Sequence, residues 1–253
     1  QVGVIEYGDI LEFRFHQGPI ALTWEAHHDE YIPGEQFRDV QKRGPFASWA
    51  HTHRFESTGQ GTSVLDDHIL YKLPLHPLSA VAAPIFGRML GGMFAFRHER
   101  TMNDLSFHQR FDDQPRQRVA ISGASGMIGT GLPHFLPTGG HSAPPVVRRP
   151  AKDSEIYWKP SDQELDAEAL EGFDVVVHLA GAGVADKRWT EDRKRVILES
   201  RRQGTRLLSE TLAKLKKKPR VLLSASAIGY YGDRADEVLT EESAAGDGFL
   251  ADV

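Results

Sequence analysis

The chain has no cysteine among its 253 residues. This absence excludes disulfide bonds, thiolate metal sites and cysteine nucleophiles, and it is compatible with a reducing, cytoplasmic location. No run approaches the roughly 18 apolar residues that a membrane span needs, and no signal-peptide pattern is visible. The net charge of -5 gives no basic surface for nucleic acid. We therefore expect a cytoplasmic protein that binds neither nucleic acid nor a membrane.

Length and hydrophobic content bound the architecture. A hydrophobic fraction of 40% suffices for real cores, and 253 residues can hold one large domain or two small ones. The sequence opens at Gln1 without a methionine and stops at Val253 in mid-pattern. We therefore expect it to be a piece of a longer protein.

The strongest motif lies in the middle of the chain, at residues 118–129 (Arg-Val-Ala-Ile-Ser-Gly-Ala-Ser-Gly-Met-Ile-Gly). An apolar run typical of a buried parallel strand precedes Gly123, Gly126 and Gly129, and helical periodicity follows. At such a junction the first glycine permits the turn, the second lets a pyrophosphate approach the backbone, and the third allows helix and strand to pack closely. The helix N-terminus then favours the phosphate charge. The pattern predicts a dinucleotide site, with an ordinary glycine-rich turn as the alternative.

Two later blocks repeat the pattern of a buried strand followed by small residues, at 173–182 and 220–232. The other elements expected in this half are strands at 142–147 and 155–158 and helices at 162–170 and 190–214. Strands that alternate with helices predict an α/β fold with a parallel sheet.

The three blocks, in this order, resemble the extended short-chain dehydrogenase/reductase superfamily, which includes nucleotide-sugar epimerases and dehydratases. The runs at 185–190, 199–208 and 224–232 are similar to those of one branch, described as epimerase-family NAD(P)-binding proteins. The resemblance covers roughly residues 116 to 253 and implies a Rossmann-type doubly wound parallel sheet. Some members of the branch carry an additional N-terminal lipid-binding-like domain.

The first part of the chain has a different pattern, with short segments of period-2 alternation separated by Gly and Pro turn signals. These segments are 10–15, 20–27, 37–40, 48–55 and 63–73. An amphipathic pattern at 84–100 follows and predicts a helix. An antiparallel meander followed by one long helix resembles the α+β helix-grip fold (START-like, SRPBCC). The family form begins with a strand and two short helices that do not precede Gln1, which leaves open whether a cavity is closed.

Two features of this region bear on ligands. The apolar stripe of the expected helix, with Met89, Met93 and Phe94, either lines a pocket for an apolar small molecule or is simply core, and we favour core. His51 and His53 point to one face of a strand and suit a metal ion, but no third ligand is evident. We therefore predict no metal site.

Residues 101–117 lack periodicity and gather charge, Gln and Pro, as a linker does. We predict a helix-grip domain at 1–113 and a Rossmann dinucleotide-binding domain at 114–253, with the boundary near Asp113. We expect the first domain to lack its N-terminal part and the second to lack its C-terminal substrate part.

The strand ends and the resemblance together assign the cofactor contacts. After the glycine loop we expect a helix at 127–136, which Pro133 should kink or shorten because it forfeits a hydrogen bond. The small residues after the next central strand permit close approach of the cofactor. The expected contacts are Gly123, Ser125, Gly126, Met127, Ile128, Gly129, Arg148, Arg149, Leu179, Ala180, Gly181, Ala182 and Ser224.

Arg148 and Arg149 follow the second strand, where a dinucleotide fold meets the adenosine ribose. An Asp or Glu at this place accepts a hydrogen bond from the 2′-hydroxyl of NAD. Two arginines instead suit a 2′-phosphate, through bidentate, charge-assisted hydrogen bonds. We therefore predict NADP in preference to NAD, with a solvated basic turn as the alternative.

The chemistry is expected at the end of the third block. In the superfamily a Ser or Thr there hydrogen-bonds the substrate oxygen, and a Tyr with a Lys four residues later is the acid/base; the resemblance assigns the first role to Ser226. The Tyr-x-x-x-Lys pair would fall within residues 246–253, which contain neither residue type. Either Tyr230 or Tyr231 has taken over, or the acid lies beyond Val253, or catalysis has been lost.

Two further residues of this half invite a role. Arg201 stands where the superfamily usually has Asn, and it either reaches toward phosphate or substrate or fills space. His178 is expected to be packed or hydrogen-bonded within the fold.

From these residues we predict an NADP-dependent oxidoreductase or nucleotide-sugar-epimerase-like enzyme that acts on a hydroxyl-bearing or carbonyl carbon of a small-molecule substrate. The alternative is an NADP(H)-binding sensor that turns nothing over, with an apolar ligand in its front domain. Oligomer formation is compatible with both.

Overall fold

The computed structural model describes residues 6–17, 20–59, 61–75, 79, 81 and 83–253. The chain divides into two compact units, Gln1–Arg100 and Thr101–Val253. The predicted domain boundary near Asp113 stays a prediction, but the helix expected to end at residue 100 continues further, because α1 runs over Ala83–Gln109. In the described ranges, no helix has the length and apolar character needed to cross a bilayer.

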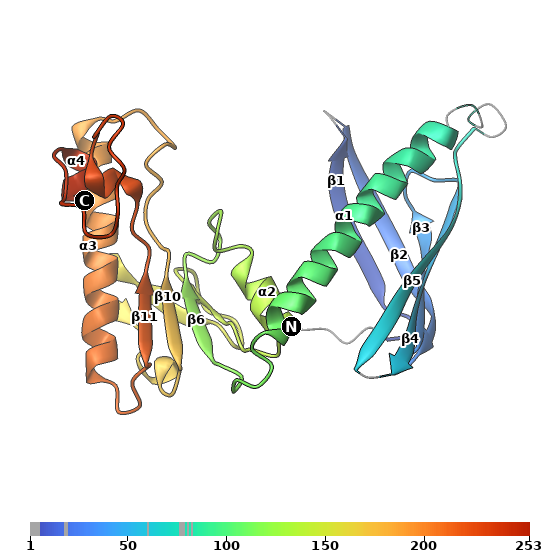
Figure 1. The fold of residues 1–253 in the computed structure, drawn as a ribbon, viewed down its shortest axis with the longest axis horizontal. Helices are drawn as coiled ribbons and strands as arrows, with labels where there is room; N and C mark the ends of the chain where they lie inside the picture. Colours follow the sequence, from blue (N-terminus) through green and yellow to red (C-terminus); the bar gives the residue numbers. More distant parts are fainter. Residues whose placement is uncertain (1–5, 18–19, 60, 76–78, 80, 82) are drawn as a thin grey trace. The chain divides into compact units, whose positions relative to one another are not determined.

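The N-terminal unit contains a five-stranded antiparallel sheet whose strands are neighbours in chain order (Figure 1). This confirms the predicted meander, although several strands are longer than expected. The strands are β1 (Ile10–Gln17), β2 (Ile20–Ile32), β3 (Gln36–Arg43), β4 (Ser48–Gly59) and β5 (Thr62–Lys72). The finer prediction of a helix-grip fold stays a prediction.

Helix α1 contacts this sheet through Phe86, Leu90 and Phe94, which are half-buried. Phe86 meets the ring of Tyr71, Leu90 packs on the buried tryptophans of the sheet, and Phe94 meets the ring of His51. Their i, i+4, i+8 spacing keeps the three on one helix face. The expected stripe of Met89, Met93 and Phe94 is therefore wrong for the two methionines, which are each 52% exposed.

The C-terminal unit is built on a six-stranded sheet in the order β11-β10-β6-β7-β8-β9. All pairs are parallel except the short β9, which is antiparallel to β8. The parallel strands therefore follow the doubly wound order, with the switch point between β6 and β10, and this confirms the predicted α/β parallel sheet. The bounds are β6 (Val119–Ser122), β7 (Pro145–Val147), β8 (Ile156–Lys159), β9 (Glu164–Leu165), β10 (Val175–His178) and β11 (Val221–Ser224).

The predicted long helix is confirmed as α3 (Glu191–Lys214). Thr190 caps it, because its hydroxyl accepts a hydrogen bond from the backbone N–H of Arg193 at 3.2 Å. The buried face of α3 includes Leu208 and Leu212, which pack with Val176 of β10 in the main core. Burial of this apolar face stabilises the helix on the sheet.

Two predicted helices differ from the structure. The helix expected at 127–136 begins only at Leu132, as α2 (Leu132–Thr138), because Pro133 suits the first turn of a helix but not its interior. The helix expected at 162–170 is replaced by 3-10 turns η2 (Pro160–Asp162) and η3 (Glu168–Leu170) flanking β9. There Gln163 has a left-handed φ of 59°, which no helix continues. Near the end of the chain lie η4 (Ile228–Tyr231) and α4 (Phe249–Asp252).

Candidate functional site

The glycine loop follows β6 at the switch point of the sheet. Gly123 has a left-handed φ of 73°, and a Cβ atom there would lie 2.7 Å from both the backbone N of Ala180 and the carbonyl carbon of Leu179. A side chain is excluded by conformation and by space. The structure therefore brings two predicted cofactor segments, 123–129 and 179–182, into backbone contact.

The other two glycines close the loop on the carbonyl group of Gly123. The backbone N–H of Gly126 donates to that carbonyl oxygen at 2.9 Å, and a Cβ on Gly126 would lie 3.3 Å from it. A Cβ on the buried Gly129 would overlap the same oxygen. Gly123 and Gly129 are thus required by the tight path of the backbone, and a side chain at Gly126 would fit only tightly.

The tip of the loop is open to solvent. Ser125, Met127 and Ile128 are exposed, and the backbone from 127 to 131 forms turns before α2 begins. The expectation that phosphates meet a helix starting at Met127 is therefore wrong in its detail. The backbone forms turns at this position, and α2 begins only at Leu132.

Helix α3 holds the loop after β10 from the side. The hydroxyl of Ser200 accepts a hydrogen bond from the backbone N–H of Ala182 at 3.0 Å, and Arg201 donates to the carbonyl of Ala182 at 2.9 Å. The guanidinium carbon of Arg201 would lie 3.0 Å from a Cβ on Gly181. Of the two roles considered for Arg201, its contacts favour the structural one, since it fixes the backbone beside Gly123.

Arg148 and Arg149 follow β7 but have different surroundings. Arg149 forms a bidentate pair with Glu155, with both N···O distances at 2.6 Å. This pair, together with the backbone N–H of Lys152, lowers the pKa of Glu155 to about 2. Arg148 is exposed, and no ion pair of its guanidinium is recorded within the described ranges. Of these two arginines, Arg148 is therefore the one whose guanidinium is not paired with a carboxylate of the described residues.

The predicted catalytic residues lie after β11. Ser224 pairs in register with His178, Ser226 is exposed two residues later, and the rings of Tyr230 and Tyr231 meet edge to face at 5.1 Å. Residues 246–253 return to this place: the N–H of Gly246 donates to the carbonyl of Tyr230 at 2.9 Å. The segment in which Tyr-x-x-x-Lys was sought thus lies beside the paired tyrosines.

His178 has the structural role that we expected. It is 3% exposed, its Nδ1 lies 2.6 Å from the hydroxyl of Ser122, and its Nε2 lies 3.1 Å from that of Thr205. Burial lowers its pKa, so the ring is neutral at pH 7. A neutral ring between two alcohols is a satisfied core group.

Two carboxylates of the N-terminal unit lie beside the histidine pair and were not predicted from the sequence. Asp39 of β3 and Asp67 of β5 flank the histidine pair of β4, because strand pairing places Asp39 opposite His51 and Asp67 opposite His53. The period-2 pattern gave the histidines a common face but did not give the register of the neighbouring strands.

A doubly wound parallel sheet with a glycine loop at its switch point defines the class of dinucleotide-binding α/β proteins. Residues 119–249 match the NAD dependent epimerase/dehydratase family. The chain belongs to this family.

Relatives match the same half of the chain. Epimerase family protein Mb2239 of Mycobacterium bovis is 41% identical over 134 residues, which are 53% of this chain and 44% of the relative. Epimerase family protein YfhF of Bacillus subtilis is 34% identical over 135 residues, 51% of this chain and 44% of the relative. Human epimerase family protein SDR39U1 is 31% identical over 132 residues, 51% and 43% of the two chains. The chain covers less than half the length of these relatives.

Solved structures extend the similarity to both units. The nucleoside-diphosphate sugar epimerase from Corynebacterium glutamicum matches 99% of this chain and 52% of its own, with a TM-score of 0.78 and 34% identity. Human SDR39U1 (isoform2), solved with NADPH, matches 53% of this chain and 45% of its own, with a TM-score of 0.47 and 29% identity.

Proposed function

We propose that the C-terminal unit binds NADP(H), with the pyrophosphate over the glycine loop. The observation that carries this proposal is the close packing of Gly123 against the backbone N of Ala180. A Cβ atom on Gly123 would lie 2.7 Å from that nitrogen. A loop that excludes every side chain at this point leaves bare backbone at the switch point, where ligands of doubly wound sheets bind. Membership of an NAD dependent family supports the same conclusion.

Arg148 is the residue that we assign to the 2′-phosphate of NADP. It is exposed at the end of β7, whereas the neighbouring guanidinium of Arg149 is bound to Glu155 at 2.6 Å. A guanidinium matches a phosphate through two parallel charge-assisted hydrogen bonds, whereas the neutral 2′-hydroxyl of NAD offers a single, weaker acceptor. The preference for NADP therefore depends on a single exposed arginine.

Calorimetric titration with NADPH and with NADH tests this assignment. We expect Arg148→Ala to weaken NADPH binding by about tenfold or more, in line with the loss of a charge-assisted contact, and to change NADH binding less than about twofold. Arg195→Ala is the matched control, since Arg195 is an exposed arginine of α3 that pairs with Asp192 of the same helix turn. Equal losses for the two cofactors would contradict the assignment.

For the reaction, we propose transfer of hydride at a carbon that bears a hydroxyl, in a small-molecule substrate such as a nucleotide sugar. When bound, the nicotinamide would accept the hydride at its C4 carbon and return it in the reverse direction. Ser226 would donate a hydrogen bond to the substrate oxygen. Tyr230 or Tyr231, in its phenolate form, would take the hydroxyl proton as that oxygen becomes a carbonyl and the hydride leaves, which gives the neutral phenol. In the reverse direction the phenol would return the proton to the oxygen.

A panel of carbonyl substrates with NADPH tests this step. Ser226→Ala should lower kcat by about 10²-fold or more with little change in NADPH affinity, because the serine acts on substrate rather than on cofactor. Tyr230→Phe and Tyr231→Phe should differ, since only one hydroxyl can hold the proton. Unchanged turnover in all three variants would exclude these residues.

The second candidate is an NADP(H)-binding protein that turns nothing over. It is favoured by the segment beside the tyrosines, residues 246–253, which contains no lysine to assist a tyrosine in proton transfer. Tight NADPH binding without oxidation by any member of the panel would support it. With this candidate we also propose that the N-terminal unit has a helix-grip fold and binds an apolar ligand. Oligomer formation is part of the same proposal.

A further inference from the structure

One face of the N-terminal sheet changes character along strand β4. Trp49, His51 and His53 alternate onto that face, and all three are buried. The tryptophan belongs to the aromatic core of the unit, with Trp24 and Leu90. The two histidines continue the same face into a polar region that α1 covers with Phe94 and His98. A buried face that becomes histidine-rich needs a compensating group.

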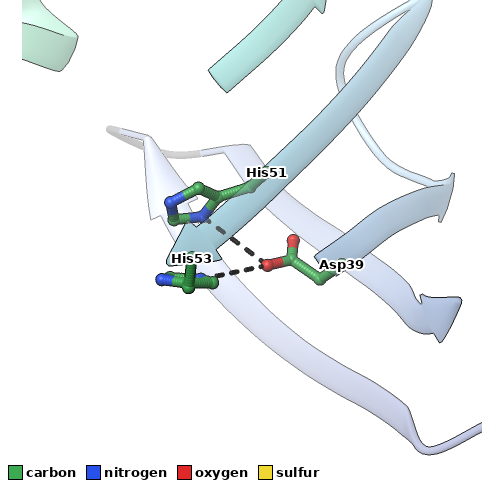
Figure 2. Close-up of side chains that lie close together, drawn as sticks. All are labelled: Asp39, His51 and His53. Carbon is green, nitrogen blue, oxygen red and sulfur yellow. Dashed lines mark ion pairs between the residues drawn. The ribbon is translucent and has the colours of Figure 1, made fainter. Parts of the chain in front are cut away.

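Two carboxylates lie against the two imidazole rings, with every ring nitrogen facing one of them. Asp67 Oδ1 is 3.1 Å from Nε2 of His51 and 2.6 Å from Nδ1 of His53. Asp39 Oδ1 is 3.5 Å from Nδ1 of His51 and 3.4 Å from Nε2 of His53, the two contacts drawn in Figure 2. The histidines are 5% and 4% exposed. The side chain of Asp67 is 2% exposed.

Two neutral imidazoles have too few N–H groups to donate to a carboxylate at all four ring nitrogens. A neutral imidazole has one N–H, so each ring can donate to one carboxylate while its other nitrogen presents a lone pair. At His51 that lone pair would face the second carboxylate without a bond, whereas at His53 the guanidinium of Arg97 is a further donor 3.5 Å from Nδ1. Protonating both rings would remove this conflict, but it would put two positive rings at a centroid distance of 3.8 Å in a buried place. Two positive rings would repel each other strongly at this distance, which opposes that solution.

The distances separate the contacts into two kinds. Those to Asp67 are hydrogen-bond lengths, whereas those to Asp39 exceed the usual range of about 2.7–3.2 Å for N–H···O bonds. Ligand atoms around a tetrahedral zinc ion with bonds of about 2.0–2.1 Å lie about 3.3–3.4 Å apart. The separations of 3.4 and 3.5 Å from Asp39 to the two nitrogens match this value, and the three donor atoms lie within 4.8 Å of one another.

We propose that the N-terminal unit holds a divalent transition-metal ion, of the zinc type, on Nδ1 of His51, Nε2 of His53 and a carboxylate oxygen of Asp39. Asp67 then accepts hydrogen bonds from the opposite nitrogen of each ring and fixes both tautomers. This is the carboxylate–histidine–metal arrangement found around zinc. Among the described residues Asp39 contacts these two imidazoles but no lysine or arginine, so the ion supplies its positive partner. Mixed imidazole and carboxylate donors suit zinc.

Three further side chains surround the site. The guanidinium of Arg97 of α1 lies 3.9 Å from Oδ1 of Asp67 and 3.5 Å from Nδ1 of His53. His98 of α1 lies 2.7 Å from the other oxygen of Asp67, which holds that carboxylate in place. His28 of β2 lies opposite Asp39 in the strand register, and its Nδ1 is buried without a hydrogen-bond partner among the described residues. This nitrogen is an independent sign of a missing partner on the same face. A water molecule is the candidate for the fourth position.

Cobalt(II) is the probe for this site, since it replaces zinc and absorbs visibly in tetrahedral coordination. The full chain, stripped with EDTA, is titrated with Co²⁺ and then with Zn²⁺ in competition. We expect one equivalent of Co²⁺ to give tetrahedral bands that Zn²⁺ removes. Asp39→Asn and His53→Gln should each lower the affinity by more than about 100-fold, and Asp67→Asn, which removes only the supporting carboxylate, by about 10- to 100-fold.

His68→Gln is the matched control, because His68 is adjacent to Asp67 on β5 but exposed on the opposite face. It should bind Co²⁺ as the wild type does. The wild-type spectrum keeps the test decisive if a ligand variant fails to fold. Absence of tetrahedral bands at one equivalent in the wild type, or equal losses in His68→Gln and Asp39→Asn, would overturn the proposal.

Discussion

The two units present their chemistry in different ways. In the C-terminal unit the candidate site is made of backbone: three glycines packed around one carbonyl group, with the N–H of Ala180 at the position that a side chain of Gly123 would occupy. In the N-terminal unit the candidate site is made of side chains from three strands, with His51 and His53 between Asp39 and Asp67. A backbone site is sensitive to added volume, whereas a side-chain site is sensitive to lost charge.

Their buried histidines show the same contrast. His178 has a hydroxyl at each ring nitrogen, and hydroxyls both donate and accept, so the neutral ring is satisfied. His51 has a carboxylate at each nitrogen, and carboxylates only accept. The first arrangement is complete within the protein, whereas for the second we propose a metal ion. The following predictions test whether this division holds.

The largest effect is expected from added volume at the glycine loop. Gly123→Ala should destabilise the C-terminal unit by about 3 kcal/mol or more, since the new Cβ would meet backbone atoms that cannot move separately. Gly172→Ala is the matched control: its φ of 72° is the same, but a Cβ there makes only ordinary contacts. Gly172→Ala should lower the free energy of unfolding by about 1–2 kcal/mol, the cost of the left-handed backbone conformation alone. Equal costs in urea unfolding would show that the loop is not crowded.

A smaller effect is expected from His178→Asn. The shorter amide can satisfy Ser122 or Thr205 but not both, so one buried hydroxyl is left unpaired, at a cost of about 1–3 kcal/mol. Urea unfolding at pH 7.5 measures it, with added Zn²⁺ as a check. Zinc should not restore the lost stability, because the site of His178 needs no ion. Restoration by zinc would contradict the division between the two histidine environments.

The pH dependence of His178 is expected to be smaller again. Because burial lowers its folded pKa below the unfolded value of about 6.5, the unfolded chain binds the proton first as pH falls. Stability from this group is therefore complete above about pH 6.5 and decreases below it, by up to about 1.4 kcal/mol per pH unit. His178→Asn should flatten this slope in EDTA-containing buffer. An unchanged slope would assign the dependence to other groups.

The smallest effect is expected at the exposed ion pair beside Arg148. With the pKa of Glu155 at about 2, the pair with Arg149 is intact from pH 5 to 8. Glu155→Gln releases Arg149 and should change NADPH affinity by about threefold or less, because exposed pairs contribute little. Calorimetric titration at pH 5.5 and pH 8 should give the same ratio. A loss above tenfold would mean that Glu155 itself binds the ribose.

The sequence predicted those parts of the molecule that depend on neighbours along the chain. The strands of both sheets, the long helix α3 and the position of the glycine loop follow from local periodicity, capping and glycine spacing. The predicted start of α2 was wrong because the prediction gave the pattern at 127–136 more weight than Pro133. The structure places this proline in the first turn of the helix. Residues 162–170 were expected as a helix on polarity alone, which does not distinguish helix from turns.

Features that depend on strand register could not be read in this way. Asp39 meets His51 only because the turn between β3 and β4 sets the pairing, and a shift of one residue would send Asp39 to the opposite face. The orientation of Met89 and Met93 likewise depends on how α1 lies on the sheet. The aspartates beside the histidine pair and the outward methionines were therefore missed for the same physical reason.

The most direct test of the dinucleotide site is amide hydrogen exchange, measured by mass spectrometry, with and without saturating NADPH. The account predicts protection in peptides that cover 123–130 and 179–183, the two backbone segments that meet at Gly123, and no change in β4 of the N-terminal unit. Binding of NADPH without protection of these two segments, or with protection confined to the N-terminal unit, would contradict it.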